Sequence, residues 1–187
     1  DFSSFGVGMR VGPRGQRVAA WSEFERDEVR LLDRRGAIAQ TLRGSDIQDV
    51  AFTPDGGAIV LASYNALHIY GHDGSHRAIE GAQGVAFSRD GRREAIIGQE
   101  SVSIRRVEGA YLGDNAEVAN LPHHMANGVW WSPDGRHILL REFVRNPDGQ
   151  VLTLVRAEDG ERVTMVKDFG KPQPMANIQD ASVAADG

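Results

Sequence analysis

One five-residue pattern recurs along this 187-residue chain and restricts the folds that are open to it. Three clear copies are Phe52–Gly56, Phe87–Gly91 and Trp131–Gly135, which run aromatic, Thr or Ser, Pro or Arg, Asp, Gly. Weaker copies begin at Val11 and Val183, so successive copies start 41, 35, 44 and 52 residues apart. A period near 40 residues is typical of repeat architectures, in which each repeat forms one supersecondary unit.

The segments between the copies predict four short strands in each repeat. In the second repeat, apolar runs at 47–52 and 58–63 flank the pattern, a third run follows at 66–70, and a more polar run follows at 75–79. Such runs between Gly, Pro, Asp and Asn residues are typical of strands joined by tight turns. No segment keeps a 3.6-residue period over ten residues, so we expect very little helix.

A four-stranded sheet of about 40 residues cannot bury both of its faces, whereas sheets stacked around an axis bury one another. The sequence therefore predicts an all-β fold, a β-propeller of four-stranded blades, as one domain or fragment over residues 1–187. The approximate blades are 4–44, 45–81, 82–122 and 123–170, and another starts at 175–187. A partial propeller is favoured because the last repeat stops after its first strand. Closure of the first blade by Met175–Val183 and an open two-sheet arrangement are the alternatives.

The pattern aromatic-Ser-Pro-Asp-Gly, followed by a basic residue and an apolar strand, resembles the repeat of TolB-like and WD-repeat-like propellers. It is also similar to the repeat in the N-terminal propellers of the prolyl oligopeptidase family. The best match is Trp131–Leu140, and the Trp-Asp dipeptide of true WD repeats is absent. For the peptidase branch, the resemblance implies a propeller that filters access to a catalytic domain outside this chain.

Composition excludes several functions. The formal net charge is −5, and the basic residues are spread along the chain, so we expect no nucleic-acid partner. The absence of Cys excludes disulfides, thiolate catalysis and Cys-ligated zinc. No apolar run reaches the length of a membrane span. The bacterial periplasm and the cytoplasm are both compatible with this composition.

We find no catalytic constellation. No Ser has Gly two residues away on both sides, so the nucleophile elbow of a serine hydrolase is missing. His68, His72 and His76 are spaced by four, but the residues around them predict strand, turn and strand, so this spacing does not bring their side chains together. The adjacent His123 and His124 would point in opposite directions on a strand. We therefore expect neither a metal site nor a cofactor. If the chain belongs to the prolyl oligopeptidase branch, the catalytic domain lies outside these residues, so the question of enzyme activity stays open.

The predicted function is a non-catalytic module that binds a protein or peptide through one face of loops. Loops vary while the blades stay fixed, and the loops that enter the first strand share a face with those between the second and third strands. An ordinary solvated surface explains the same residues equally well. The candidate binding residues are Glu23, Arg26, Tyr64, Gln99, His123, His124 and Arg141.

The alternative function is a substrate-gating propeller of a prolyl-oligopeptidase-like serine hydrolase. Its partners would be further blades or a hydrolase domain of the same parent protein. The Pro-Asp-Gly turns fall on the opposite face, and we predict that they are structural. By strand alternation, Phe52, Phe87 and Trp131 pack between blades, whereas Trp130 points to the other face of its strand.

Overall fold

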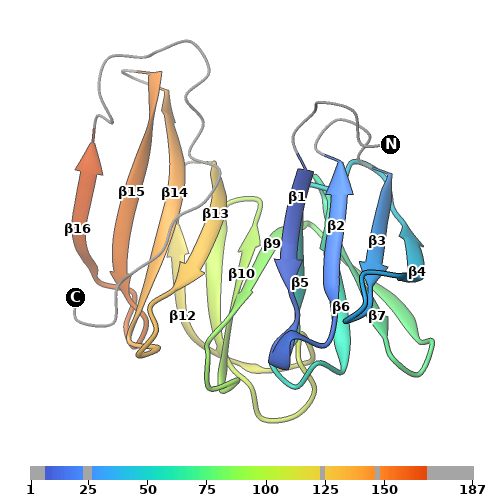
Figure 1. Ribbon diagram of the computed structural model, residues 1–187. Helices are drawn as coiled ribbons and strands as arrows, with labels where there is room; N and C mark the ends of the chain where they lie inside the picture. Colours follow the sequence, from blue (N-terminus) through green and yellow to red (C-terminus); the bar gives the residue numbers. More distant parts are fainter. Residues whose placement is uncertain (1–6, 23–26, 123–124, 146–147, 168–187) are drawn as a thin grey trace. The chain divides into compact units, whose positions relative to one another are not determined.

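The computed structural model describes residues 7–22, 27–122, 125–145 and 148–167, which form an all-β architecture (Figure 1). Sixteen strands make four antiparallel sheets of four strands each. Within every sheet the strands pair in their order along the chain, as successive hairpins. The described residues contain one helical segment, the 3-10 turn Pro13–Gly15. The prediction of an all-β protein built from four-stranded blades is confirmed.

The four sheets are called blades 1 to 4 in chain order. Blade 1 contains β1 (Val7–Val11), β2 (Val18–Ser22), β3 (Glu28–Leu32) and β4 (Ile38–Arg43). Blade 2 contains β5 (Asp49–Phe52), β6 (Ala58–Ala62), β7 (Ala66–Gly71) and β8 (His76–Glu80). Blade 3 contains β9 (Ala82–Phe87), β10 (Arg93–Gly98), β11 (Ser101–Arg106) and β12 (Ala116–Pro122). Blade 4 contains β13 (Ala126–Trp131), β14 (His137–Arg145), β15 (Asp148–Arg156) and β16 (Arg162–Lys167). The predicted start of a further blade at 175–187 lies outside the described residues.

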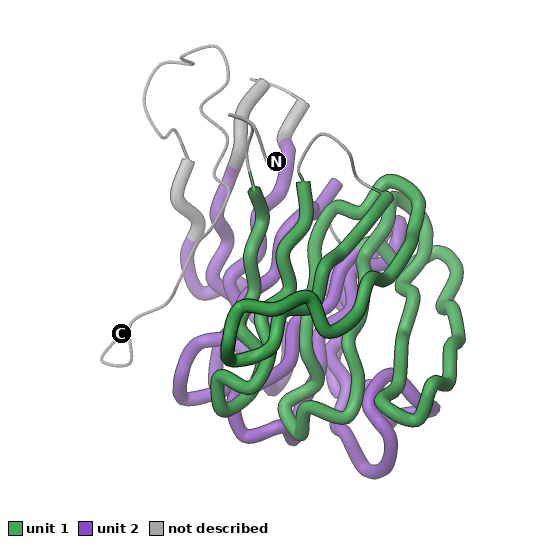
Figure 2. The backbone as a smooth tube through the Cα atoms, turned by 45° about the vertical axis from the view of Figure 1, so that its right-hand side comes forward, with its two compact units in different colours: residues 1–83 green, residues 84–187 purple. Residues whose placement is uncertain are grey.

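The chain divides into two compact units, residues 1–83 and 84–187 (Figure 2). Unit 1 holds blades 1 and 2. Unit 2 holds blade 4 and all of blade 3 except the first two residues of β9. Each unit has an apolar core of its own, formed where its two blades face each other.

Strand alternation builds the core of unit 1. On β3, Val29 and Leu31 are buried, while the intervening Arg30 is only partly covered. Both side chains belong to a cluster that also contains Trp21 of β2 and Leu61 of β6. Phe52 packs against this cluster, as predicted for the aromatic residue of the repeated pattern. Apolar surface from both blades is thereby removed from water, which is the main driving force for their association.

The core of unit 2 is built in the same way. Ile104 of β11 and Ile138 of β14 are fully buried in one cluster. Trp131 packs against this cluster, and its Nε1 donates a hydrogen bond of 3.0 Å to the carbonyl oxygen of Ala86 on β9. The aromatic ring therefore joins blade 4 to blade 3. Phe87 makes an edge-on contact with Tyr111, at a centroid distance of 5.3 Å.

A buried carboxylate holds the connection between β11 and β12. Glu94 of β10 is 0% exposed. Its Oε2 accepts a hydrogen bond of 2.8 Å from the Leu112 amide, and its Oε1 accepts one of 2.9 Å from Asn115 Nδ2. Both carboxylate oxygens are therefore satisfied, as a buried charge requires. The described residues contain no helix that is long and apolar enough to cross a membrane.

Candidate functional site

The repeated pattern forms the turn between the first and second strands of blades 2, 3 and 4. Its hydroxyl residue, Thr53, Ser88 or Ser132, donates to the Oδ1 of the aspartate two positions later, at 2.7, 2.7 and 2.6 Å. The same hydroxyl accepts the amide five positions later, at 2.9 Å in all three turns. The glycine has φ values of 75°, 71° and 69°, a region that glycine enters without a steric penalty. Each turn thus satisfies its own polar groups within six residues.

These hydrogen bonds lower the pKa of the three aspartates. For Asp134 the hydroxyl of Ser132 contributes most, and for Asp90 the backbone amide two residues later contributes most. For Asp55 the largest single effect is burial, which raises the pKa, but the hydrogen bonds from Thr53 and the backbone together outweigh it. All three carboxylates are therefore ionised at neutral pH, where they accept hydrogen bonds most strongly.

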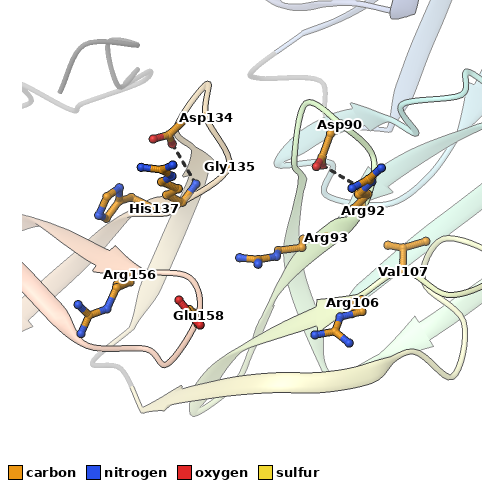
Figure 3. Close-up of a pocket in the computed structure, with 11 residues that line it drawn as sticks. Asp90, Arg92, Arg93, Arg106, Val107, Asp134, Gly135, His137, Arg156 and Glu158 are labelled. Atoms are coloured by element: carbon orange, nitrogen blue, oxygen red, sulfur yellow. Dashed lines mark hydrogen bonds between the residues drawn. The ribbon is translucent and has the colours of Figure 1, made fainter.

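The end of each blade that carries this turn is called the turn side, and the other end is called the loop side. On the turn side of unit 2, a cavity of about 720 Å³ lies between blades 3 and 4 (Figure 3). His137 and the carboxylates of Asp90, Asp134 and Glu158 contribute to its lining. Arginines are the commonest lining residue: Arg92, Arg93, Arg106, Arg136 and Arg156. This cavity is called the arginine cleft.

Strand register explains why arginines meet in the arginine cleft. Arg93 begins β10 and Arg106 ends β11, and the two residues are directly opposite in the antiparallel ladder. By alternation both share the face of blade 3 that carries Ile97 and Ile104 of the core. Figure 3 shows Arg93 extending from its strand toward the space between the two blades. Arg156 ends β15 of blade 4, opposite His137 of β14. The turns on this side were predicted to be structural, and none of these arginines was among the predicted binding residues. The Arg-Arg dipeptides at 92–93 and 105–106 were the available signal.

The corresponding space in unit 1 is much smaller, about 100 Å³. Tyr70, opposite Ile59 in blade 2, lines it, and its hydroxyl donates a hydrogen bond of 2.8 Å to the Arg43 carbonyl oxygen of blade 1. The equivalent position in blade 4, opposite Ile138, is Val155. Val155 is fully buried in the core of unit 2 and does not line the cleft, whereas the tyrosine lines the smaller space of unit 1.

The predicted binding residues divide into two groups. Glu23, Arg26, His123 and His124 lie outside the described residues. Tyr64 lies in the β6–β7 loop of unit 1, Gln99 lies in the β10–β11 loop of unit 2, and Arg141 lies midway along β14. Tyr64 and Gln99 are thus on the loop side of their blades, as expected, and each belongs to a different unit.

Tyr64 is held at the tip of a short, well-bonded loop. It is 71% exposed, an unusual position for a large aromatic side chain. The amide and the hydroxyl of Ser63 both donate to the Ala66 carbonyl oxygen, at 2.9 Å each. The Gly81 amide donates to the Asn65 carbonyl oxygen at 2.7 Å. The residues on both sides of Tyr64 are therefore fixed, while its ring faces water.

Arg141 is supported by the neighbouring strand β13. Its Nε donates a hydrogen bond of 2.7 Å to Asn127 Oδ1, and its guanidinium lies 5.6 Å from the centre of the Trp130 ring. An arginine over a tryptophan face makes a favourable cation–π contact. Trp130 is on the opposite face of β13 from the core residue Trp131, as strand alternation predicted.

The histidines of blade 2 differ from expectation. The rings of His68 and His76 stack at 5.8 Å, and Tyr70 stacks on His76 at 4.5 Å. The spacing of the three histidines was expected not to converge, but adjacent antiparallel strands place His68 and His76 on one face of the blade. Among the residues that the structure describes, no group of three or more His, Asp or Glu side chains is arranged to hold a metal ion.

Comparisons with known proteins identify the fold. No protein-family model matches the chain, and no curated protein matches it in sequence. Solved structures do match. A eukaryotic initiation factor is 13% identical with a TM-score of 0.60, and the alignment covers 89% of this chain and 43% of the initiation factor chain. Hydrazine synthase of Kuenenia stuttgartiensis, at 17% identity and a TM-score of 0.56, aligns 80% of this chain with 52% of its own. A functionally unknown protein from Desulfotomaculum acetoxidans, at 17% identity and a TM-score of 0.62, aligns 88% with 58%.

These similarities show a β-propeller fold, and this chain spans roughly half the length of the matched structures. At such low identity they carry no activity, substrate or partner over to this chain. The resemblance to TolB-like, WD-repeat-like and prolyl oligopeptidase propellers stays a prediction.

Proposed function

We propose that this chain is a non-catalytic β-propeller segment that binds a protein or peptide through the loop side of its blades. The observation that carries this proposal is the exposed ring of Tyr64 on a loop whose flanking residues are hydrogen-bonded. Tyrosine is enriched among the residues that dominate binding energy in protein interfaces, because it offers a large contact area with few rotatable bonds.

The hydrogen bonds around Tyr64 add to its suitability for binding. Ordering a loop upon association costs free energy that subtracts from affinity. In the β6–β7 loop that cost is already met in the free protein, because Ser63 and Asn65 are bonded within blade 2. A ring presented in this way loses little entropy when a partner covers it.

Unit 2 presents a related set of groups. Gln99 is exposed in the two-residue β10–β11 loop, and Met125 is exposed just before β13. Met and Arg are, like Tyr, enriched in protein interfaces, and Arg141 is fixed by Asn127 and Trp130. An amide, a thioether and a guanidinium offer both hydrogen bonds and apolar contact to a peptide.

The proposal is tested with peptides selected from a displayed random library on the immobilised chain. Dissociation constants are then measured for the wild type and for Tyr64→Ala, Gln99→Ala and Arg141→Ala. We expect Tyr64→Ala to weaken binding at least about tenfold, because interface tyrosines typically contribute more than about 1.4 kcal/mol. Tyr64→Phe keeps the ring and should retain most of the affinity.

Arg34→Ala is the matched control, since Arg34 is exposed in the β3–β4 turn, on the turn side of blade 1. It should bind the selected peptides as the wild type does. If the peptides bind all three loop-side variants with unchanged affinity, the loop side is not the binding surface and the proposal fails.

A further inference from the structure

Arg93 and Arg106, called the arginine pair below, carry like charges at directly opposite positions of neighbouring strands. Opposite residues of an antiparallel ladder have Cβ atoms about 5 Å apart, and like charges there destabilise a sheet. Within the described part of the chain, neither side chain of the arginine pair forms an ion pair. Arg93 is half-buried, so water screens its charge only in part.

Other arginines of unit 2 are neutralised by carboxylates. Arg156 forms ion pairs with Asp159, at 2.9 Å, and with Glu161. Arg162 forms one of 3.2 Å with the buried carboxylate of Glu142. Arg156 and Arg162 thus each have a carboxylate within ion-pair distance. The arginine pair instead places two like charges opposite each other in one ladder, and such local inconsistency is expected where a binding site is present.

The arginine cleft places the arginine pair beside an open space of about 720 Å³. Arg93 interacts electrostatically with Asp90 and helps to lower the pKa of that carboxyl. The lining holds five arginines and three carboxylates, so positive charge is in excess. Arg92 and Arg136 add further positive charge at its turns. Asp90 and Asp134 each use one carboxylate oxygen to close their turns. Glu158 lies across the cavity from the arginine pair (Figure 3). A ligand there meets two guanidinium groups on one wall and a carboxylate acceptor on the other.

We propose that the arginine cleft of unit 2 binds a phosphate monoester. A phosphate monoester is close to a dianion at neutral pH, so one group balances the two charges of the arginine pair. Guanidinium groups hold phosphate oxygens through paired hydrogen bonds, which gives the contact a defined geometry. Glu158 accepts a hydrogen bond from a hydroxyl or amide group elsewhere on the ligand. The ligand is therefore polar beyond its phosphate.

The phosphate has two sources with the same chemistry: a small phosphorylated molecule or a phosphorylated side chain of a peptide. The site is on the turn side of unit 2 and shares no residue with the loops of the proposed function, so the two proposals are tested independently. Binding of either source would add a ligand site to a part of the repeat that otherwise serves to build the blades.

Isothermal titration calorimetry of the full chain at pH 7.5 and low salt tests the proposal. The probes are glycerol 3-phosphate and a phosphoserine heptapeptide, with glycerol and the unphosphorylated heptapeptide as their matched comparators. We expect saturable binding of at least one phosphorylated probe and none of either comparator. Arg93→Gln combined with Arg106→Gln should weaken that binding at least about tenfold.

The double variant Arg34→Gln with Arg35→Gln removes the same charge from an exposed turn of unit 1 and should bind within twofold of the wild type. The thermal midpoint of the cleft variant should equal or exceed that of the wild type, because a like-charge contact has been removed. Binding of both probes would mean that the phosphate group is sufficient for recognition. Binding of one probe would show whether the cleft takes a small phosphorylated molecule or a phosphorylated peptide. No saturable binding of either probe, or equal binding by the cleft variant, would overturn the proposal.

Discussion

At the scale of single residues, the hydroxyl of the repeated turn performs two tasks at once. In blade 4, Ser132 donates to Asp134 and accepts the His137 amide. In blade 3, Ser88 likewise donates to Asp90 and accepts the Arg93 amide. Both serines are buried, at 3% and 1% exposure, so water cannot replace the lost bonds when the hydroxyl is removed.

We therefore expect Ser88→Ala and Ser132→Ala each to lower the free energy of unfolding by about 1–2 kcal/mol at pH 7, measured by urea denaturation. Ser45→Ala, at an exposed position in the β4–β5 connection, is the control and should stay within about 0.5 kcal/mol. Equal stabilities of the buried and exposed variants would contradict the assigned role of the hydroxyl.

The same variants have a defined pH dependence. The folded state lowers the pKa of Asp90 and Asp134 below the value of about 3.9 that is typical of an unfolded chain. Their stabilising contribution is complete above that unfolded value and is lost as the pH falls through the folded pKa. Without the serine hydroxyl the shift is smaller, so stability should fall less steeply between pH 5 and pH 2 in the variants. Parallel curves for variant and wild type would contradict this linkage.

The residue types of the repeated pattern predicted the tight turn but not the second hydrogen bond of its hydroxyl. Asp and Gly in a fixed order predict a tight turn, because Asp bonds its own turn amides and Gly takes positive φ. The double role of Ser88 could not be predicted in the same way, since it depends on the amide of Arg93, on the next strand. Sequence order gives neighbours along the chain, whereas that bond requires the two strands to be in register.

At the scale of elements, the clearest dependence is that of the β11–β12 connection on Glu94. Two donors, the Leu112 amide and Asn115 Nδ2, point at its two carboxylate oxygens. Leu112 has a φ of 57° and is buried, so the connection holds a non-glycine residue in the left-handed region. The carboxylate offsets that unfavourable conformation by fixing the backbone amide.

Glu94→Gln replaces one of the two carboxylate oxygens with an NH2 group, which then faces either the Leu112 amide or Asn115 Nδ2, both of which are donors. We expect the free energy of unfolding to fall by about 1–3 kcal/mol and hydrogen exchange at the Leu112 amide to accelerate. NMR-detected exchange measures the second effect directly. Glu108→Gln, at an exposed position in the same connection, should leave both quantities unchanged. Unchanged exchange at Leu112 in Glu94→Gln would contradict the assigned contact.

Periodicity predicted the elements well and the arginine cleft not at all. Alternation on β3 and the turn residues between strands marked the strands, because each strand must bury one face. The arginine pair arises from the partnership of Arg93 with Arg106, thirteen positions apart, and the far wall of the cleft comes from Glu158 and other residues of a different blade. Neither relation leaves a periodic trace in the sequence.

At the scale of the whole molecule, stability is expected to reside in the two cores and not on the far face of blade 1. Leu61 is fully buried in the core of unit 1, and Leu140 is buried in the core of unit 2. By contrast, Val11 on β1 is 68% exposed, and Met9 is exposed as well. Apolar side chains contribute to stability only in so far as folding removes them from water.

Leu61→Ala and Leu140→Ala should each lower the free energy of unfolding by about 2–5 kcal/mol, the usual cost of such a cavity. Val11→Ala, which also shortens an apolar side chain, should change it by less than about 0.5 kcal/mol. Urea denaturation of the full chain measures all three. A large loss in Val11→Ala would mean that the face of blade 1 is covered in the folded protein.

The self-contained turns also have an evolutionary consequence. The position that follows each turn is Ala58 in blade 2, Arg93 in blade 3 and His137 in blade 4, and in all three its backbone amide and carbonyl make the hydrogen bonds to the turn hydroxyl. These hydrogen bonds do not depend on the side chain, which differs in all three copies. Selection can alter the space beside one blade by a single substitution and leave the other copies intact. A repeated chain of this kind acquires new surfaces one blade at a time, without a new fold.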